Sequence, residues 1–231
     1  MKKQVYSRLT LLSLFVALMA LSLLPAAKAD GPVRNDNLIP FYGDVRGPMC
    51  HPTNNAVGMI TAMTPLDTLL FNHTRRMSGG ILVPAACNPV LAPDGHQLTL
   101  GEFNAVVGRV SVKCINEGTL SVLHYSGLQP KGVYSVWIVI PNPTPPPGAL
   151  GVGTLGRTEL SENHFIASEA GEGQISRTTP EEDLSVVGHV GQCFLDSPVE
   201  LHLVYHIDQQ THGFTPGPLP TWVVNARFLF P

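Results

Sequence analysis

Two histidines and an aspartate lie close together near the C-terminal end of the sequence. His206 and Asp208 are separated by one residue, and His212 follows four residues after the aspartate. Imidazole nitrogens and carboxylate oxygens are ligands that zinc and copper accept in proteins. We therefore interpret His206, Asp208 and His212 as a candidate metal site where a strand ends and its loop begins. Three other histidines are candidates for a fourth ligand: His124, His164 and His189.

The same residues also have a purely structural interpretation. Asp208 can order the loop through an Asx-type turn, while the histidines bond to backbone groups. His202 precedes His206 by four residues, so both lie on one face of a strand, but too far apart to bind one ion without a bend. The chain also lacks the His-x-His pairs on which the copper–zinc dismutases, another group of exported β-sandwiches, depend.

Motifs of common enzymes are missing or lack their structural context. Residues 151–156 match the dinucleotide-binding spacing G-x-G-x-x-G, but prolines precede them and no helical pattern follows. The sequence contains no G-x-S-x-G, S-x-x-K or H-E-x-x-H motif. A carbohydrate-active enzyme that uses Glu102 with Asp94 or Asp208 is a weaker hypothesis, because it depends on the distance between the two carboxyl groups.

Four cysteines follow the N-terminal segment: Cys50, Cys87, Cys114 and Cys193. An even number of cysteines in an exported chain indicates two disulfides, for which three pairings exist. We favour Cys50–Cys87, which would tie down the N-terminal segment, and Cys114–Cys193, which would join two predicted strands. A cysteine metal cluster is not indicated, because close pairs such as C-x-x-C are missing from the sequence.

The N-terminus has the three-part layout of a secretory signal peptide. Three basic residues precede an apolar run over residues 9–24, and Ala27-Lys28-Ala29 fits the pattern that signal peptidase cleaves. An uncleaved membrane anchor is the alternative, but the run is somewhat short for a span of about 20 residues. We predict that residues 1–29 are removed and that a secreted or periplasmic protein begins at Asp30, with no membrane span left.

Charge excludes one class of partner. Residues 1–29 hold four of the 14 basic residues and none of the 17 acidic ones, which leaves 10 basic residues and a net charge of −7 after cleavage. Nucleic-acid binding requires clustered lysine and arginine. We therefore expect no nucleic acid as a partner, and an extracellular ligand or protein of unknown identity instead.

Alternation of apolar and polar residues with a period of two dominates the chain from Gln97 onward. A hairpin is predicted from strands at 106–114 and 119–125, joined by a tight turn at Asn116-Glu117-Gly118. Further strands are expected at 133–140, 164–170, 173–178, 184–190, 199–207 and 221–230, with a Pro/Gly-rich loop at 142–156. This spacing predicts an all-β, immunoglobulin-like antiparallel β-sandwich over residues 94–231.

Residues 30–93 are expected to form an irregular N-terminal extension, because their first part is polar and rich in proline and glycine. One short helix is predicted within it. Thr64 suits the N-cap and Pro65 the first helical position. Three leucines, at 66, 69 and 70, would share one face, and the helix would end at Ser78-Gly79-Gly80.

The spacing Leu128-x-Pro130-x-x-x-Tyr134 resembles the tyrosine corner of fibronectin-type and immunoglobulin-like sandwiches. In those proteins the tyrosine hydroxyl bonds back to the upstream backbone and pins a loop that crosses between sheets. The resemblance implies a structural role for Leu128, Pro130 and Tyr134.

Three longer motifs, at residues 94–103, 127–134 and 205–213, resemble an uncharacterised family of exported bacterial β-sandwich proteins. The resemblance covers roughly residues 94–230 and implies one exported β domain. It implies no activity and no catalytic residues, because none is established for the family.

Two functional hypotheses of different classes follow. The first is a non-enzymatic secreted or surface-associated binding module that needs no cofactor and contacts its ligand through the loops at 142–156 and 208–218. The second is an extracytoplasmic protein that binds zinc or copper through His206, Asp208 and His212. Metal analysis of the purified mature protein distinguishes them.

Overall fold

The computed structural model describes residues 41–42, 48–50, 57–59, 63–78, 81–142, 149–160, 162–218 and 220–230. All of them belong to the unit that spans Pro32–Pro231. The predicted signal peptide and its cleavage site lie outside the described residues.

Antiparallel strands make up most of the described chain, which confirms the all-β prediction. The strands are β1 (Phe41–Tyr42), β2 (Pro48–Cys50), β3 (Val57–Met59), β4 (Phe71–Ser78), β5 (Ile81–Pro89), β6 (Val107–Ile115), β7 (Gly118–Ser126), β8 (Val133–Pro141), β9 (Ala149–Thr154), β10 (His164–Ile166), β11 (Gly173–Thr179), β12 (Val199–His206) and β13 (Trp222–Phe230). The described helices are short: α2 (Leu100–Asn104), α3 (Glu181–Val186) and the 3₁₀ turn η2 (Thr158–Leu160).

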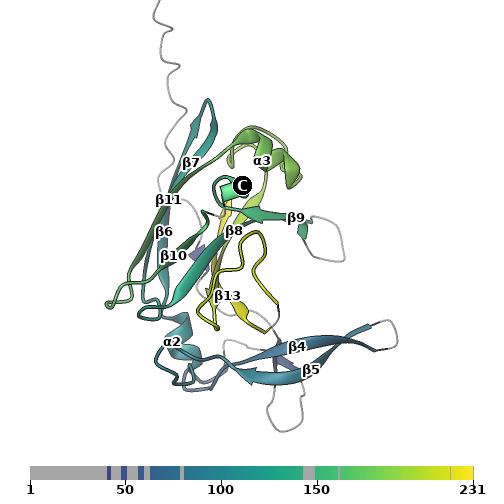
Figure 1. The fold of residues 1–231 in the computed structure, drawn as a ribbon, viewed down its shortest axis with the longest axis vertical. Helices are drawn as coiled ribbons and strands as arrows, with labels where there is room; N and C mark the ends of the chain where they lie inside the picture. The colour runs from purple at the N-terminus through teal and green to yellow at the C-terminus, as the bar shows by residue number, and fades with distance from the viewer. Residues whose placement is uncertain are drawn as a thin grey trace, which may run out of the picture. The chain divides into compact units, whose positions relative to one another are not determined.

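Two sheets contain most of these strands (Figure 1). The large sheet has the order β1-β13-β12-β8-β10, and β9 pairs with β8 as well. The small sheet has the order β11-β7-β6. Two separate hairpins, β2-β3 and β4-β5, come from the N-terminal region. Helices α2 and α3 lie at opposite ends of the two main sheets.

Both sheets contribute one face to a common hydrophobic core, which explains the period of two in the sequence. Val110 and Val112 of β6 are buried in it together with Val136 and Ile138 of β8. Aromatic contacts also connect the sheets, since the ring of Tyr125 in β7 lies 6.0 Å from that of Phe228 in β13. The finer assignment to an immunoglobulin-like sandwich stays a prediction.

A disulfide joins Cys114 of β6 to Cys193, 79 residues further along the chain. This confirms the predicted pairing, although Cys193 lies in the loop before β12 and not in a strand. Cys87 is also disulfide-bonded, and the described residues contain no free cysteine. The predicted Cys50–Cys87 pair lies outside the described part of the chain, because the side chain of Cys50 is not described.

Tyr134 is fully buried at the start of β8, and its hydroxyl accepts a hydrogen bond from the backbone N–H of Gln129 at 2.8 Å. Leu128 is buried beside this contact, whereas Pro130 is exposed. The bond therefore runs from the tyrosine back to the upstream loop, as a tyrosine corner requires.

The helix predicted from Thr64 is wrong. A turn at residues 65–68 is followed by strand β4, and Leu70 makes strand-like backbone bonds to Leu98 and Val90. Those partners lie 20 or more residues away in the sequence, so local signals for an N-cap could not reveal them. The N-terminal extension is also less irregular than expected, because it contains β1 to β5.

Two further expectations are corrected. The alternation predicts a strand at residues 184–190, but α3 occupies Glu181–Val186, where three acidic residues stand in the first turn and Leu184 is buried. Acidic side chains favour that end of a helix because of its dipole. The loop expected at 142–156 contains strand β9, which pairs with β8.

Two of the buried tyrosines, Tyr134 and Tyr125, give a stability prediction. Tyr134→Phe removes the acceptor for the buried Gln129 N–H, so we expect the free energy of unfolding to fall by about 1–3 kcal/mol. Tyr125→Phe is the matched control, because the Tyr125 hydroxyl is buried without a partner among the described residues, and its removal should be neutral or stabilising. Urea denaturation measures both. Equal effects of the two substitutions would contradict the role of the hydroxyl at residue 134.

Candidate functional site

The candidate site forms where β12 ends and the chain turns toward β13. His206 is the last residue of β12 and lies between Val133 of β8 and Trp222 of β13. Tyr205, the preceding residue, points into the core. Because neighbouring residues in a strand face opposite sides, His206 lies on the outer face of the large sheet, where it is nevertheless only 1% exposed.

The three residues predicted from the sequence come together at this point. His206, Asp208 and His212 each offer one ligand atom, and these atoms lie within 4.8 Å of one another. The rings of His206 and His212 are 6.0 Å apart, and Nε2 of His212 is 2.9 Å from Oδ2 of Asp208. Asp208 and His212 are partly exposed, so the group opens toward solvent from a buried base.

Gln209 holds the start of the loop in place. Its backbone has a φ of +57°, in the left-handed region that few non-glycine residues adopt. The Gln209 side chain donates to the Tyr205 hydroxyl and to the backbone oxygen of His206, both at 2.9 Å. Its amide oxygen accepts from the backbone N–H of Val133 at 3.1 Å. These bonds fix the sharp turn that brings Asp208 back beside His206.

The second half of the loop packs against His212. Gly217 has a φ of +98°, and a Cβ atom there would collide with the His212 ring. The indole N–H of Trp222 donates to the backbone oxygen of Gly217 at 2.9 Å. The position of the His212 ring therefore depends on a glycine at this point of the loop.

The structural interpretation of Asp208 also has support. Oδ1 of Asp208 accepts a hydrogen bond from the backbone N–H of Gln210 at 3.2 Å, which is an Asx-type turn. Oδ2 of Asp208 contacts Nε2 of His212. Asp208 therefore orders the loop through Oδ1 and contacts His212 through Oδ2. The structural interpretation and the metal-site interpretation are compatible, because they use different oxygens of this carboxylate.

The two ring nitrogens of His206 have different surroundings. Nε2 lies 2.7 Å from Oγ of Ser135, which also accepts a hydrogen bond from the indole N–H of Trp137 at 2.7 Å. Nδ1 is buried and has no hydrogen-bond partner among the described residues. Burial lowers the pKa of His206 to about 4, against the opposing effect of Asp208. His206 is therefore neutral near pH 7, the form in which imidazole binds a metal.

The other histidines are placed differently, and none of those described joins the group. His189 bonds through both nitrogens, to the backbone oxygen of Cys193 at 2.8 Å and to Ser197 at 3.0 Å. His202 pairs with Glu200 at 2.6 Å, and His124 lies on the small sheet. His164 of β10 is a cross-strand neighbour of Ser135 and contributes to lowering the pKa of His206.

Sequence reasoning missed Ser135, Trp137 and Gln209. Ser135 is a polar residue inside the otherwise nearly continuous apolar strand β8, and that irregularity was the available signal. Its contact with His206 joins residues 71 positions apart, so the pairing of β8 with β12 had to be known first.

The proposed carboxylate pair of a glycosidase has another role. Asp94 and Glu102 both contact His96, at 2.6 and 3.2 Å, and Glu102 forms a capping box with Thr99 at the start of α2. Hydrogen bonds from His96 lower the pKa of Asp94, and hydrogen bonds from Thr99 lower that of Glu102. A general acid in a glycosidase needs a raised pKa, so these surroundings disfavour that hypothesis.

The glycines of the dinucleotide-like motif serve packing. A Cβ atom at Gly151 or Gly153 of β9 would collide with Val187, just after α3. The glycines therefore allow β9 to lie close to that segment, and no helix begins on them.

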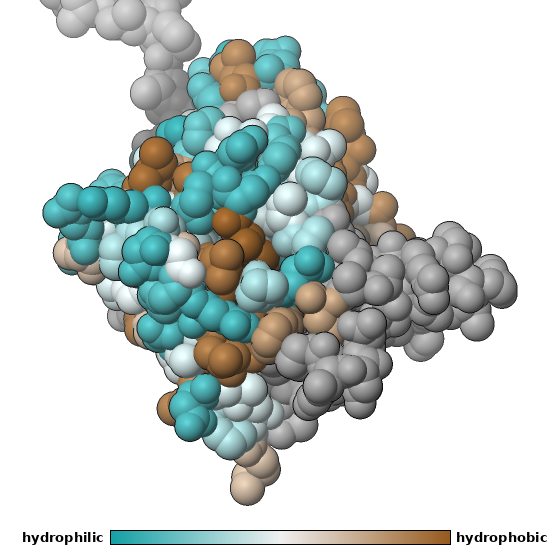
Figure 2. Space-filling model, turned by 60° about the horizontal axis from the view of Figure 1, so that its bottom comes forward, coloured by the Kyte–Doolittle hydropathy of each residue, from teal (hydrophilic) through white to brown (hydrophobic). Residues whose placement is uncertain are grey.

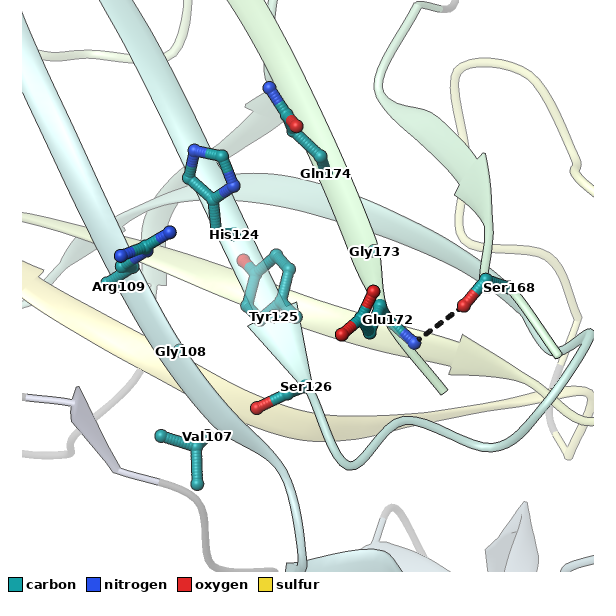
Figure 3. A pocket seen from close by; sticks show the side chains of 10 residues that line it. All are labelled: Val107, Gly108, Arg109, His124, Tyr125, Ser126, Ser168, Glu172, Gly173 and Gln174. Carbon is teal, nitrogen blue, oxygen red and sulfur yellow. Dashed lines mark hydrogen bonds between the residues drawn. The ribbon is translucent and has the colours of Figure 1, made fainter. Parts of the chain in front are cut away.

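A second feature is a groove of about 600 Å³ lined by residues of the small sheet and by Ser168 and Glu172 (Figure 3). Arg109, His124 and Gln174 are cross-strand neighbours on β6, β7 and β11 and line it. Glu172 lies beside Gly173 at the start of β11, where its backbone N–H donates to Ser168 at 3.1 Å. The groove therefore combines polar side chains with apolar surface in similar amounts.

The face drawn in Figure 2 has a mixed surface, with hydrophilic residues predominating and hydrophobic residues in small separate groups. None of the described helices is long and hydrophobic enough to span a bilayer. The Cys114–Cys193 disulfide is compatible with an extracytoplasmic protein.

Comparison with known proteins found no matching family model, no matching curated protein and no matching solved structure. The resemblance of three motifs to exported bacterial proteins stays an expectation. Functional inference for this chain therefore depends on the geometry of its own residues.

Proposed function

We propose that this chain is a secreted or periplasmic protein that binds zinc or copper through His206, Asp208 and His212. The observation that carries the proposal is that His206, Asp208 and His212 each offer a ligand atom within 4.8 Å of the others, while the buried Nδ1 atom of His206 lacks a hydrogen-bond partner among the described residues. Export is supported by the signal-peptide layout of residues 1–29 and by the Cys114–Cys193 disulfide.

An unpartnered buried polar atom costs about 1–3 kcal/mol, and a metal ion at Nδ1 would remove that cost. The ion would also replace the proton that Nε2 of His212 and Oδ2 of Asp208 now share across 2.9 Å. Nε2 of His206 is already engaged with Ser135, which leaves Nδ1 as the free ligand atom.

Two imidazoles and one carboxylate would leave one coordination position for water or an external ligand. Structural zinc sites commonly have four protein ligands, whereas open sites have three. The described residues supply no fourth histidine, cysteine or carboxylate to the group. The site is therefore of the open kind.

Titration of metal-free protein with zinc and copper by calorimetry tests the proposal. We expect one equivalent to bind, and His212→Ala to weaken binding at least 100-fold because it removes one of three ligands. His212 is partly exposed in a loop, so this variant should keep its fold, as circular dichroism can verify. His124→Ala is the control and should bind like the wild type. Absence of binding by the wild type, or unchanged binding by His212→Ala, would refute the site.

The groove on the small sheet favours a second candidate function, a binding module for a small acidic saccharide. Arg109 supplies guanidinium donors suited to a carboxylate, while Gln174, Glu172 and Ser126 can bond to hydroxyl groups. Val107 and Tyr125 add apolar surface to the groove, against which the ring carbons of a saccharide can pack. This hypothesis places recognition on the sheet and not in the loops expected from the sequence.

NMR titration with glucuronate, glucose and sulfate tests this second function. We expect glucuronate to shift the amide signals of Gly108 and Gly173, which line the groove. Arg109→Ala should weaken glucuronate binding at least tenfold, whereas Arg157→Ala, which removes an exposed arginine outside the groove, should not. Equal binding of glucose would show that the carboxylate is not recognised, and equal binding of sulfate would show a simple anion site. Unchanged spectra would eliminate the groove as a saccharide site.

A further inference from the structure

We infer that Ser135, anchored by Trp137, is a positioning residue whose hydroxyl lets the buried His206 change tautomer when a metal binds. The part of this inference that concerns metal-bound His206 rests on the proposed function. The part that concerns the tautomer of metal-free His206 does not depend on metal binding.

The three side chains form a short hydrogen-bonded chain beneath the candidate site. Ser135 and Trp137 are two residues apart on β8, so both lie on its outer face together with His206 of β12. Ser135 is 2% exposed, Trp137 is 4% exposed and His206 is 1% exposed. The Trp137 indole nitrogen and Nε2 of His206 are each 2.7 Å from Oγ of Ser135.

The donor and acceptor groups of Trp137, Ser135 and His206 define the direction of these hydrogen bonds in the metal-free protein. An indole N–H only donates, so Oγ of Ser135 accepts from Trp137. If the Ser135 hydroxyl then donates to Nε2, both its donor and its acceptor functions are used, and the proton of neutral His206 lies on Nδ1. His206 belongs to the same group of potential ligands as Asp208.

The opposite tautomer satisfies fewer groups. If Nε2–H donates to Oγ, the Ser135 hydroxyl proton has no further acceptor among the described residues, whereas Nδ1 of His206 lacks a hydrogen-bond partner with either tautomer. Chains in which each group donates to the next also strengthen one another. We therefore assign the Nδ1–H tautomer to metal-free His206.

Metal binding reverses the role of Ser135. A metal at Nδ1 requires a bare lone pair there, so the ring proton must lie on Nε2. Oγ of Ser135 has two lone pairs and can accept from Nε2–H while it still accepts from Trp137. A metal-bound histidine commonly donates its other N–H to such a partner, and loss of that partner typically weakens metal binding 10- to 100-fold.

The chain provides a closely matched control. Ser121 of β7 is also fully buried, but its hydroxyl has no partner among the described residues. Ser121→Ala therefore removes a buried serine hydroxyl without touching the chain beneath His206. Trp137→Phe removes the anchoring N–H and keeps a smaller aromatic ring in β8.

Long-range proton–nitrogen NMR on protein labelled at histidine measures the tautomer directly, without and with zinc. We expect His206 to carry its proton on Nδ1 without metal and on Nε2 with zinc. Ser135→Ala should bind zinc 10- to 100-fold more weakly, Trp137→Phe should weaken it less, and Ser121→Ala should bind like the wild type. Ser135→Thr, which retains a hydroxyl, should recover most of the affinity.

The outcomes separate this inference from the proposed function. An Nε2–H tautomer in the metal-free wild type would overturn the assignment whether or not zinc binds. Normal zinc affinity in Ser135→Ala, with zinc bound by the wild type, would overturn the role of Ser135 and leave the metal site intact. Absence of zinc binding by the wild type would overturn the part that concerns metal-bound His206 together with the proposed function.

Discussion

The position of His206 depends on the alternation of side chains along β12. Tyr205 is fully buried, with its ring 5.2 Å from Tyr134 and 6.3 Å from Phe103. Removing a buried aromatic ring costs about 3–5 kcal/mol, more than the cost of an unpartnered polar atom. Core packing therefore keeps Tyr205 inside and holds the next residue, His206, on the outer face of the sheet, even though burial disfavours its charged form.

The same tyrosine connects the core to the loop. Its hydroxyl donates to the backbone oxygen of Leu91 at 2.7 Å and accepts from Gln209 at 2.9 Å. A left-handed backbone costs a non-glycine residue about 1–2 kcal/mol, and the three side-chain hydrogen bonds of Gln209 offset that cost. The loop that presents Asp208 and His212 is thus attached to the core by specific contacts.

The sequence predicted most strands of the two main sheets because their alternation reflects burial on one face. It failed where long-range contacts decide the local structure. Leu70 is extended because Leu98 and Val90 provide its backbone partners, and β9 forms because its glycines allow close approach to Val187. Helix α3 has only six residues, and such a short helix depends on tertiary contacts, here the burial of Leu184, more than on propensity.

The candidate site was predictable only in part for the same reason. His206, Asp208 and His212 lie within seven residues of one another, so their spacing alone suggested a common site, whereas Ser135 reaches His206 through strand pairing. The structural alternative explains two of the three polar groups: the Asx turn uses Oδ1 of Asp208, and Oδ2 pairs with His212. It gives Nδ1 of His206 no partner. Ser121 and Tyr125 also have buried hydroxyls without a partner among the described residues, so what sets His206 apart is that its ring lies in one group with Asp208 and His212.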